Sequence, residues 1–378
     1  MTCETYLPRI GGAEIHVKNL FERLLRNGHE VSLLTNERGP EMLGVTRIPW
    51  SKSESYKLCK AVWGQSKHVD LIHSHYCHRL ALISGLVGLI RRKPVVVTLH
   101  GMGILDHPTA SRWGRISHSF YRYWSLQFAT QIISTSEDLA KVADKYISRK
   151  KMIVIMNGYD SHLFKKVEAD SDSLTPDGNG KKIVMTVRRL VPKNGIQYLI
   201  EAVPQIVQKN NDVRFLLLGD GPLRERLEQR VQELHIENYV TFFGRISNDL
   251  VVEYLDNADV VVFPSTAESS SIACAEAMGM GKVVVASRVG GLVELLGKNE
   301  ERGYLVNLVS WEGSNYDAPE QLPDLSYDNL ARAVLQAIDD SNEGNTMKST
   351  AAYEYATHYL SWDAIFENTE SVYKNVIK

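Results

Sequence analysis

The chain has 378 residues, 44% of them hydrophobic and 23% charged, with a formal net charge of −2, which are ordinary values for a globular protein. It is long for one hydrophobic core and suits two. No apolar run reaches the roughly 20 residues of a membrane-spanning helix, Met1–Glu4 lacks the basic and apolar start of a signal peptide, and the four cysteines form no CxxC pair. We therefore expect a two-domain cytoplasmic protein in a reducing compartment.

The first half of the chain predicts short buried strands that alternate with helices. The strands are expected at Glu30–Thr35, Leu71–His75, Val95–His100, Gln131–Ser134 and Ile153–Met156. Their continuous apolar runs are typical of strands buried on both faces of a parallel sheet. A helix is expected at Ala13–Asn27, closed by Gly28. Since only Met1–Tyr6 precede the first glycine-rich loop, the first strand is predicted to be very short or partly missing.

The second half repeats this pattern. Strands are expected at Lys182–Val187, Arg214–Gly219, Val240–Phe243, Asp259–Pro264 and Lys282–Ser287. Helices are expected at Gly195–Lys209, Leu223–Leu234, Asn248–Asn257 and Ser271–Met280. Strands and helices in alternation predict an α/β fold with right-handed crossovers.

A polar segment separates the two halves. Residues 166–181 are almost devoid of apolar side chains, which is typical of a linker. We expect a Rossmann-like acceptor-binding domain at 1–165 and a Rossmann-like nucleotide-sugar-binding domain at 182–361. The two domains are expected to face each other across a cleft, and a C-terminal helix at about 362–378 to return to the first domain.

The strongest chemical signal lies between Phe263 and Met278. A predicted strand ends at Pro264, a polar loop follows, and a helix is expected to begin near Ser271. Free N–H groups and the dipole at such a helix N-terminus bind anions. Glu268 in the loop and Glu276 in the helix are suited to sugar hydroxyls, because a carboxylate accepts two hydrogen bonds. Read alone, each also fits an ordinary helix residue.

Two further groups of residues are candidates for binding a diphosphate. Gly11 and Gly12 open the first helix, so that the backbone can approach a diphosphate closely; a plain tight turn is the alternative. Arg188, Arg189 and Lys193 follow the first strand of the second domain. These cations could offset the charge that builds up on a departing diphosphate, although such a loop is otherwise usually solvated surface.

Metal binding is the weaker interpretation of the histidine-rich segment. On an extended strand His73, His75 and Cys77 would share a face, and these are ligands that zinc prefers. No second cluster supplies a matching pair. Asp170-Ser171-Asp172 lies in the linker with no apolar strand before it, so it is expected to be solvated. We predict no metal and no cofactor.

Taken in order, several segments resemble those of the retaining glycosyltransferases of family four (glycosyltransferase group 1), which have the GT-B fold. The resemblance spans nearly the whole chain and centres on the spacing of Glu268, seven residues and Glu276. The other matching segments are Pro8–Glu14, Asn27–Val31, Val97–Gly101, Met156–Gly158, Leu218–Pro222, Ala258–Ser265 and Val289–Glu294.

The resemblance implies a retaining hexosyl- or N-acetylhexosaminyl-transferase. A nucleotide-diphosphate sugar would bind mainly to the second domain, and a glycan or lipid-linked acceptor to the first. Glu276 would bind the donor ribose and Glu268 the transferred sugar. Backbone amides of Ser269, Ser270 and Ser271 would meet the sugar or diphosphate. The family commonly has Gly-Phe-Gly at these three positions, so the hydroxymethyl groups narrow the pocket and put the identity of the sugar in doubt.

The family also places an arginine and, five residues later, a lysine beside the diphosphate. If Arg189 is matched to that arginine, Asn194 stands where the lysine belongs, whereas Arg188 and Lys193 restore the spacing if the loop shifts by one residue. We predict that Lys193 acts with one of the two arginines. His100 would lie close to the reacting sugar, although a lone histidine at a strand end is often structural. No general base is assigned, because the leaving phosphate would remove the acceptor proton.

Two other functions share this architecture. Sugar-nucleotide epimerases and phosphorylases have the same two-domain shape, but the epimerases lack the Glu268 and Glu276 arrangement, and the phosphorylases are far longer and need a lysine-bound pyridoxal phosphate. A non-catalytic protein that binds sugar nucleotides is the other alternative, favoured by the departures at Asn194 and at residues 269–271.

The first half is basic and the second acidic. Residues 1–165 carry 23 Lys and Arg against 13 Asp and Glu, whereas residues 166–378 carry 20 against 32. Between His107 and Ser136 there is no acidic residue, and aromatic residues are interleaved with arginines: Arg112, Trp113, Arg115, Phe120, Tyr121, Arg122, Tyr123, Trp124 and Phe128. Such a mixture is typical of a helix that lies in a membrane interface. We predict peripheral binding to an anionic membrane, at its inner face, rather than to nucleic acid, for which no recognition motif is present. The alternative is that the aromatic residues pack inward.

Overall fold

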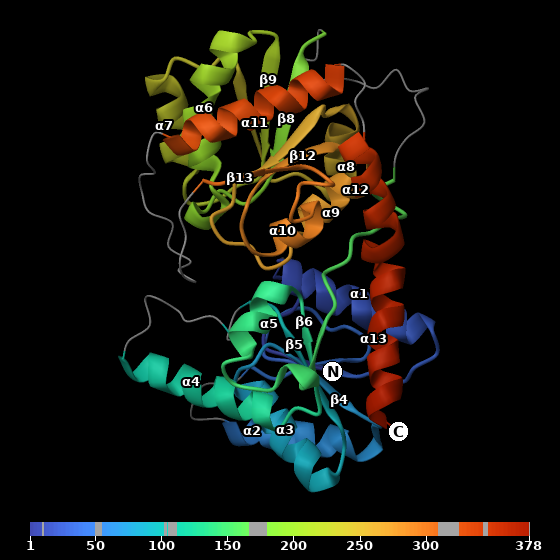
Figure 1. Cartoon of the computed structure of the whole chain (residues 1–378). Coiled ribbons are helices and arrows are strands. Elements are labelled where there is room, and N and C mark those ends of the chain that lie inside the picture. The colour runs from blue at the N-terminus through green and yellow to red at the C-terminus, as the bar shows by residue number, and fades with distance from the viewer. Residues whose placement is uncertain are drawn as a thin grey trace. The chain divides into compact units, whose positions relative to one another are not determined.

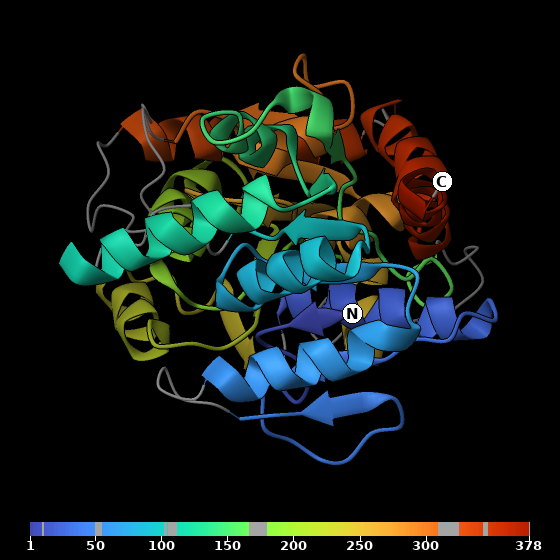
Figure 2. The ribbon, with the colours of Figure 1, turned by 90° about the horizontal axis from the view of Figure 1, so that it is seen from below.

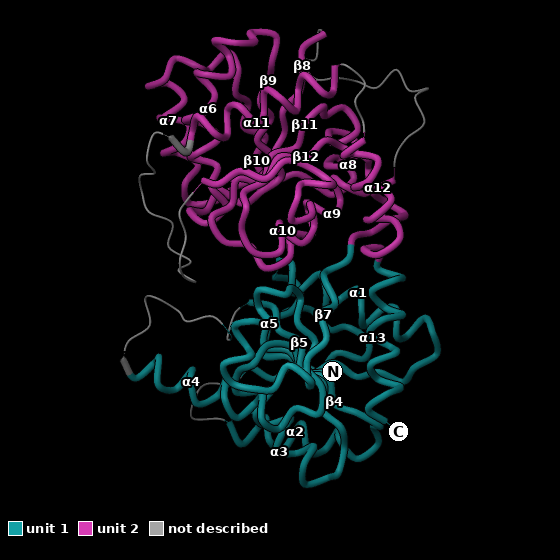
Figure 3. The backbone as a smooth tube through the Cα atoms, in the orientation of Figure 1, with its two compact units in different colours: residues 1–158, 362–378 teal, residues 159–361 magenta. Residues whose placement is uncertain are grey.

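The computed structural model of the chain describes residues 1–9, 11–49, 55–101, 104, 112–165, 180–308, 325–342 and 347–377. It divides into two compact units (Figures 1 and 3). Unit 1 comprises Met1–Gly158 and Trp362–Lys378, and unit 2 comprises Tyr159–Ser361. Unit 2 therefore begins at Tyr159, before the boundary expected at residue 165. Most of the predicted linker, residues 166–179, lies outside the described residues.

Unit 1 contains a seven-stranded parallel sheet in the order β3-β2-β1-β4-β5-β6-β7. Its strands are β1 (Thr2–Cys3), β2 (Leu33–Thr35), β3 (Val45–Arg47), β4 (Ile72–His75), β5 (Val95–Leu99), β6 (Gln131–Ser134) and β7 (Met152–Val154). The first strand has two residues and is as short as the sequence predicts. The edge strand β3 was not predicted.

Helices cover both faces of this sheet. They are α1 (Gly12–Arg26), α2 (Ser55–Gln65), α3 (Arg79–Arg91), α4 (Arg112–Gln127), α5 (Glu137–Ala143) and α13 (Trp362–Ile377). Helices α2, α3 and α4 lie side by side on one face (Figure 2), and α1 packs against α13. Successive side chains of β2 point to opposite faces of the sheet. Leu33 therefore packs with Val17 of α1, whereas Leu34 packs with Leu58 of α2.

Unit 2 contains a six-stranded sheet in the order β10-β9-β8-β11-β12-β13, again parallel throughout. Its strands are β8 (Lys182–Val187), β9 (Val213–Leu218), β10 (Val240–Gly244), β11 (Val260–Phe263), β12 (Val283–Ser287) and β13 (Tyr304–Val306). Its helices are α6 (Ile196–Lys209), α7 (Arg224–Glu233), α8 (Asn248–Asn257), α9 (Ile272–Gly279), α10 (Gly290–Leu296), α11 (Leu325–Asn342) and α12 (Met347–Tyr355). Helix α6 packs against α11, and α9 packs against α12 (Figure 1).

Each unit is thus a parallel α/β sheet between helical layers, which confirms the predicted fold class of two Rossmann-like domains. In both sheets the loops that follow the strands gather at the carboxyl edge, where α/β proteins place their ligands. Among the described residues no helix is both long and apolar enough to cross a bilayer.

Candidate active site

The loop between β11 and α9 carries the main cluster of unit 2. It is held closely from two sides. Gly195 has a φ of 72°, and a Cβ there would come within 1.7 Å of the Pro264 carbonyl oxygen. On the other side, the Gly291 amide donates to the Glu268 carbonyl at 3.1 Å, and a Cβ on Gly291 would lie 2.1 Å from the Ser269 carbonyl. These approaches require glycine and hold the backbone of the loop on both sides of Glu268.

Glu268 forms a nearly buried ion pair with Arg188, which follows β8. Each side chain is only 10% exposed. The Arg188 guanidinium donates to the Glu268 carboxylate, to the Ser265 hydroxyl, and to the Ser271 hydroxyl at 3.2 Å. Burial raises the pKa of the Glu268 carboxyl, but Arg188 and Lys193 outweigh it and hold that pKa below its usual value. Glu268 is therefore ionised at neutral pH.

Lys193 is the second cation beside this carboxylate. It lies in the short 3-10 turn Pro192–Asn194. Its carbonyl accepts a hydrogen bond from the Thr266 amide at 2.8 Å, which ties the turn to the loop of Glu268. Burial lowers the pKa of the Lys193 ammonium, and the attraction of Glu268 partly restores it. Lys193 is therefore a poorly hydrated cation close to the Glu268 carboxylate.

The predicted alternatives to Arg188 and Lys193 are arranged differently. Arg189 is exposed, and its carbonyl accepts a hydrogen bond at 2.7 Å from the side-chain amide of Asn194. Asn194 itself is buried. The structure therefore brings Arg188 and Lys193 to Glu268, in the register shifted by one residue, and uses Asn194 to shape the turn.

The three serines after Glu268 have different surroundings. The Ser269 amide donates to the Glu268 carboxylate at 3.2 Å. Ser270 and Ser271 are buried. The Ser271 hydroxyl caps α9 by accepting from the Cys274 amide at 3.3 Å and also accepts from Arg188. That hydroxyl is consequently committed to the helix terminus and to the guanidinium.

Glu276 lies on α9 and is half-buried. Burial raises the pKa of its carboxyl to about 8, and the neighbouring Asp160 acts in the same direction. Glu276 is therefore largely protonated at pH 7. Asp160 was not singled out from the sequence, since it lies more than 100 residues away in the segment that leads into unit 2.

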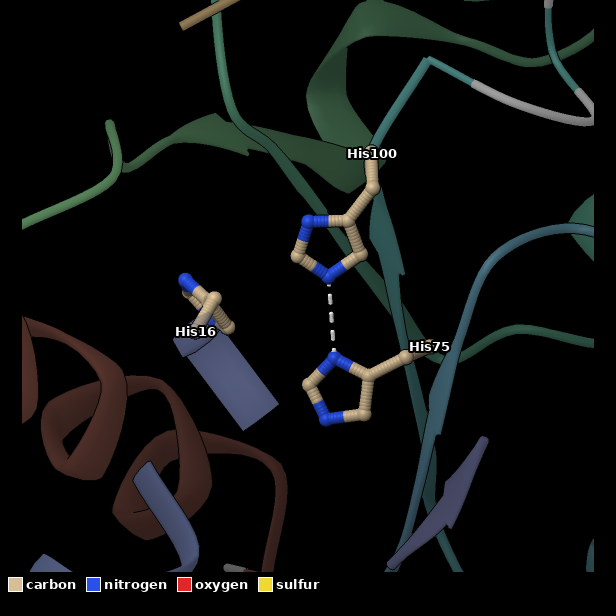
Figure 4. A group of neighbouring side chains, drawn as sticks. All are labelled: His16, His75 and His100. Carbon is tan, nitrogen blue, oxygen red and sulfur yellow. Dashed lines mark hydrogen bonds between the residues drawn. The ribbon is translucent and has the colours of Figure 1, made fainter. Parts of the chain in front are cut away.

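Unit 1 has its own cluster, made of the imidazoles of His16, His75 and His100 (Figure 4). His16 comes from α1, His75 ends β4, and His100 follows β5. Nδ1 of His75 lies 3.1 Å from Nε2 of His100, and the His16 ring meets the His100 ring edge-on with centroids 4.8 Å apart. Burial lowers the pKa of all three, that of His16 to about 4, so the rings are neutral at pH 7.

The alternative zinc set of His73, His75 and Cys77 does not come together. His73 is hydrogen-bonded to the Tyr373 hydroxyl at 2.5 Å and to the Thr98 hydroxyl at 2.7 Å. Cys77 packs in the core of unit 1. Within the described residues, the group whose nitrogens could share one ion is instead His16, His75 and His100, with ligand atoms all within 4.8 Å of one another. No local sequence pattern links His16 to the other two, because it lies on a distant helix.

The predicted diphosphate loop of unit 1 has an acidic neighbour. Gly11 is the N-cap of α1 and Gly12 its first residue. A Cβ on Gly11 would lie 2.6 Å from a carboxylate oxygen of Glu14, and the Glu14 side chain accepts from the Tyr76 hydroxyl at 3.4 Å. A carboxylate at this helix terminus opposes the binding of a second anion there.

Comparisons with known proteins agree with this architecture. The model of glycosyl transferases group 1 matches residues 170–315, and that of glycosyltransferase family 4 matches residues 10–163. An uncharacterized glycosyltransferase of Methanocaldococcus jannaschii is 30% identical over 309 residues, which cover 77% of this chain and 79% of the relative. The gpi3 subunit of phosphatidylinositol N-acetylglucosaminyltransferase from Schizosaccharomyces pombe is 23% identical over 404 residues, covering 100% of this chain and 80% of the relative.

Solved structures share the fold over the whole chain. Sucrose-phosphate synthase from Thermosynechococcus elongatus has a TM-score of 0.76 at 24% identity, covering 99% of this chain and 98% of that structure. An Anabaena protein in complex with UDP-glucose has a TM-score of 0.77 at 20% identity, covering 99% of both chains. The chain therefore belongs to the group 1 family of glycosyltransferases, with the two α/β domains of the GT-B fold.

Proposed function

We propose that the protein is a retaining glycosyltransferase that moves a hexose or N-acetylhexosamine from a nucleotide-diphosphate sugar to a glycan or lipid-linked acceptor. The observation that carries this proposal is the Arg188, Glu268 and Lys193 cluster at the carboxyl edge of the unit 2 sheet. It joins cations that suit a diphosphate to a carboxylate that suits sugar hydroxyls. A structural neighbour solved with UDP-glucose supports the class of donor.

The chemistry follows from these charges. As the bond between the sugar and the diphosphate breaks, negative charge grows on the leaving phosphate, and Arg188 and Lys193 stabilise it. Glu268 orients the transferred sugar through its hydroxyls. The leaving phosphate oxygen takes the proton of the acceptor hydroxyl as that hydroxyl attacks from the same face, so the configuration at the anomeric carbon is retained.

Transfer can be tested with labelled nucleotide sugars and acceptor extracts. We expect a labelled product whose new glycosidic bond has the anomeric configuration of the donor, as read from the proton coupling constant of the anomeric carbon's hydrogen. A product of inverted configuration would contradict retention. Turnover of the donor to free sugar and nucleotide alone, in the presence of every acceptor fraction, would favour a hydrolase.

The donor affinity should depend on pH through Glu276. Its carboxyl has a pKa of about 8 in the unliganded protein, and we expect the carboxylate form to accept the ribose hydroxyls. Below that pKa, binding must release one proton, so the donor Kd should fall about tenfold per pH unit as the pH rises from 6 towards 8, and then level off. Isothermal titration calorimetry between pH 6 and pH 9 measures this.

The matched control is Glu276→Gln, which keeps the size of the side chain but cannot ionise. It should flatten the pH dependence and weaken donor binding at pH 9 by about ten- to a hundredfold, the value of hydrogen bonds to a charged acceptor. A wild-type Kd that stays within twofold across this pH range would refute the ribose role of Glu276.

We also propose that transfer is independent of divalent metal. Arg188 and Lys193 stand beside Glu268 and supply the positive charge that a metal bridging the diphosphate would otherwise supply. Activity should therefore survive excess EDTA at the level of the untreated enzyme. Loss of activity in EDTA, followed by recovery on addition of manganese, would overturn this expectation.

The acceptor side of the proposal concerns helices α3 and α4. Neither helix contains an acidic residue, and together they expose a set of large apolar side chains. The exposed members are Leu86, Leu89 and Ile90 on α3 and Trp113, Ile116, Phe120, Tyr123 and Trp124 on α4. Trp113 is 80% exposed. Exposed aromatic and aliphatic residues at helical spacing suit the headgroup region of a membrane, so we propose that unit 1 works on a lipid-linked acceptor there.

The structure corrects the part of the membrane prediction that concerns the arginines of α4. Arg122 is buried, donates to the Ile104 carbonyl at 2.7 Å and lies over the Tyr146 ring. It cannot contact a lipid headgroup. Arg115 is exposed, and the side chain of Arg112 lies outside the described residues. Replacing Arg122 would therefore test the stability of unit 1 rather than membrane binding.

Vesicle co-sedimentation tests the apolar surface directly. The wild type should bind vesicles that contain anionic lipid at low salt. Trp113→Ser combined with Phe120→Ser should weaken this binding at least about tenfold, because each aromatic side chain withdrawn from water contributes about 1.5–3 kcal/mol. The matched control is Tyr359→Ser, an exposed aromatic residue of unit 2, which should bind as the wild type does. Equal binding by all three proteins would refute the role of α4.

A further inference from the structure

We infer that His75 is a positioning residue for His100. Its Nδ1 holds the Nε2 of His100, so that Nδ1 of His100 is the atom that remains for a sugar hydroxyl of the bound substrate. The role in catalysis rests on the proposed glycosyl transfer, whereas the contact between the two rings stands on the geometry of unit 1.

The topology of the sheet places the two rings together. His75 is the last residue of β4 and pairs in register with Thr98 of β5, and His100 comes two residues after Thr98. Adjacent parallel strands therefore end side by side and deliver both imidazoles to the same edge of the sheet (Figure 4). The planes of the rings differ by only 23°, with 3.1 Å between Nδ1 of His75 and Nε2 of His100. This arrangement suits a hydrogen bond between the two ring edges.

A single proton lies in that hydrogen bond. Burial lowers the pKa of both imidazoles, so each ring carries one N–H at neutral pH. One N–H is used between the rings, and the other must lie at an outer nitrogen, either Nε2 of His75 or Nδ1 of His100. Both outer nitrogens are buried and have no hydrogen-bond partner among the described residues. A buried imidazole nitrogen without a partner is unusual in a folded protein.

The His73 ring lies beside His75, whereas the His16 ring contacts both His75 and His100. His73 lies 4.2 Å from His75 between centroids and is itself fixed by Tyr373 and Thr98. His16 is fixed through the hydrogen bond of its Nδ1 with Asn157 at 3.0 Å. His100 is the partly exposed member of the cluster. The His100 ring is held at its Nε2, and its Nδ1 has no partner among the described residues. That nitrogen suits a hydrogen bond with a sugar hydroxyl, because a hydroxyl can either donate or accept.

The first test compares two substitutions of His75. Asparagine places an amide near the position of the imidazole Nδ1, whereas leucine fills the space without a polar atom. His75→Leu should lower kcat by about two- to tenfold, the equivalent of one hydrogen bond, while the donor Kd stays unchanged. His75→Asn should recover most of the lost kcat. His78→Asn is the control, because His78 belongs to the same segment but not to the pair.

If His75→Leu and His75→Asn reduce kcat equally while both remain folded, the positioning role is overturned. An increase in the donor Kd with unchanged kcat would overturn it as well. If the wild type transfers no sugar, the proposed function fails, and the contact between the rings is decided by the second test alone.

The second test uses nuclear magnetic resonance of protein labelled with 15N in its histidines and does not require activity. In the wild type His75 and His100 should each be a single neutral tautomer, and His100 should revert to a mixture of tautomers in His75→Leu but not in His78→Asn. Unchanged His100 nitrogens in His75→Leu would refute the inference. So would stoichiometric Zn²⁺ that shifts His16, His75 and His100 together, since the cluster would then be a metal site.

Discussion

Replacing Arg188 with alanine should destabilise unit 2 by about 3–5 kcal/mol, because the nearly buried Glu268 carboxylate loses its ion-pair partner and keeps only the nearby Lys193 charge and the Ser269 amide. The same substitution removes donors to the hydroxyls of Ser265 and Ser271. Hydrogen exchange followed by mass spectrometry can measure the effect within unit 2, and we expect the largest loss of protection in peptides from β11 and α9. Transfer should be lost even at temperatures where the variant is folded.

A double variant separates stability from chemistry. Arg188→Ala combined with Glu268→Gln removes the unpaired charge, so it should recover much of the protection of unit 2 but none of the activity. If Arg188→Ala alone lowers the stability of unit 2 by less than about 1 kcal/mol, Lys193 and the Ser269 amide hold the Glu268 charge without Arg188, and the ion pair contributes no more than an exposed one.

Replacing Lys193 with alanine should lower kcat by about a hundred- to a thousandfold, the usual effect of removing one group that stabilises charge in a transition state. The donor Kd should change much less, since the negative charge grows only as the bond breaks. Steady-state kinetics together with donor titration separate the two quantities.

Asn194→Ala is the matched control for this prediction. The Asn194 amide donates to the Arg189 carbonyl, so the substitution should loosen the turn but leave most of the turnover. Full activity in Lys193→Ala together with loss of activity in Asn194→Ala would show that the other register of the loop is the functional one. Arg189→Ala, at an exposed position, should have a smaller effect than Arg188→Ala.

The sequence predicts the long buried strands well. The bounds of β6 and β8 are those expected, because each has adjacent β-branched or apolar residues at its centre, Ile132 and Ile133 in β6 and Ile183, Val184 and Met185 in β8. The strands β3 and β13 are not predicted from the sequence. Each has three residues, which is too short to show a period, and β3 is a partly exposed edge strand with a mixed composition.

The site was predictable only as far as local pattern reaches. Neighbouring residues on an extended chain point in opposite directions, so the sequence offers both Arg188 and Arg189, and the packing of Ser265, Glu268 and Phe263 decides for Arg188. The contact of His16 with His100 joins a helix to a distant strand end. No spacing in the sequence encodes such a contact, because it depends on how the elements pack in three dimensions.

Arg122 of α4, by contrast, could have been assigned correctly from the sequence. A row of basic and aromatic residues predicts an interfacial helix, but one face of any such helix must cover the protein. Arg122 falls on that inner face, beside Ser125 and Leu126, which are also buried. Helical periodicity separates it from the exposed Trp113 and Phe120, and this separation is visible in the sequence alone.

Donor binding to unit 2 is the most direct test of the proposed function. The thermal unfolding of the wild type should be measured with UDP-, GDP- and ADP-sugars, each at a concentration about 100 times a dissociation constant in the micromolar range. The variants Arg188→Ala and Glu276→Gln should be measured in the same way. One class of nucleotide sugar should stabilise the wild type by about 2.7 kcal/mol, raising its Tm, and should stabilise both variants much less. If no nucleotide sugar raises the Tm of the wild type, or if the variants respond as strongly as the wild type, then unit 2 does not hold a sugar-nucleotide donor through these residues.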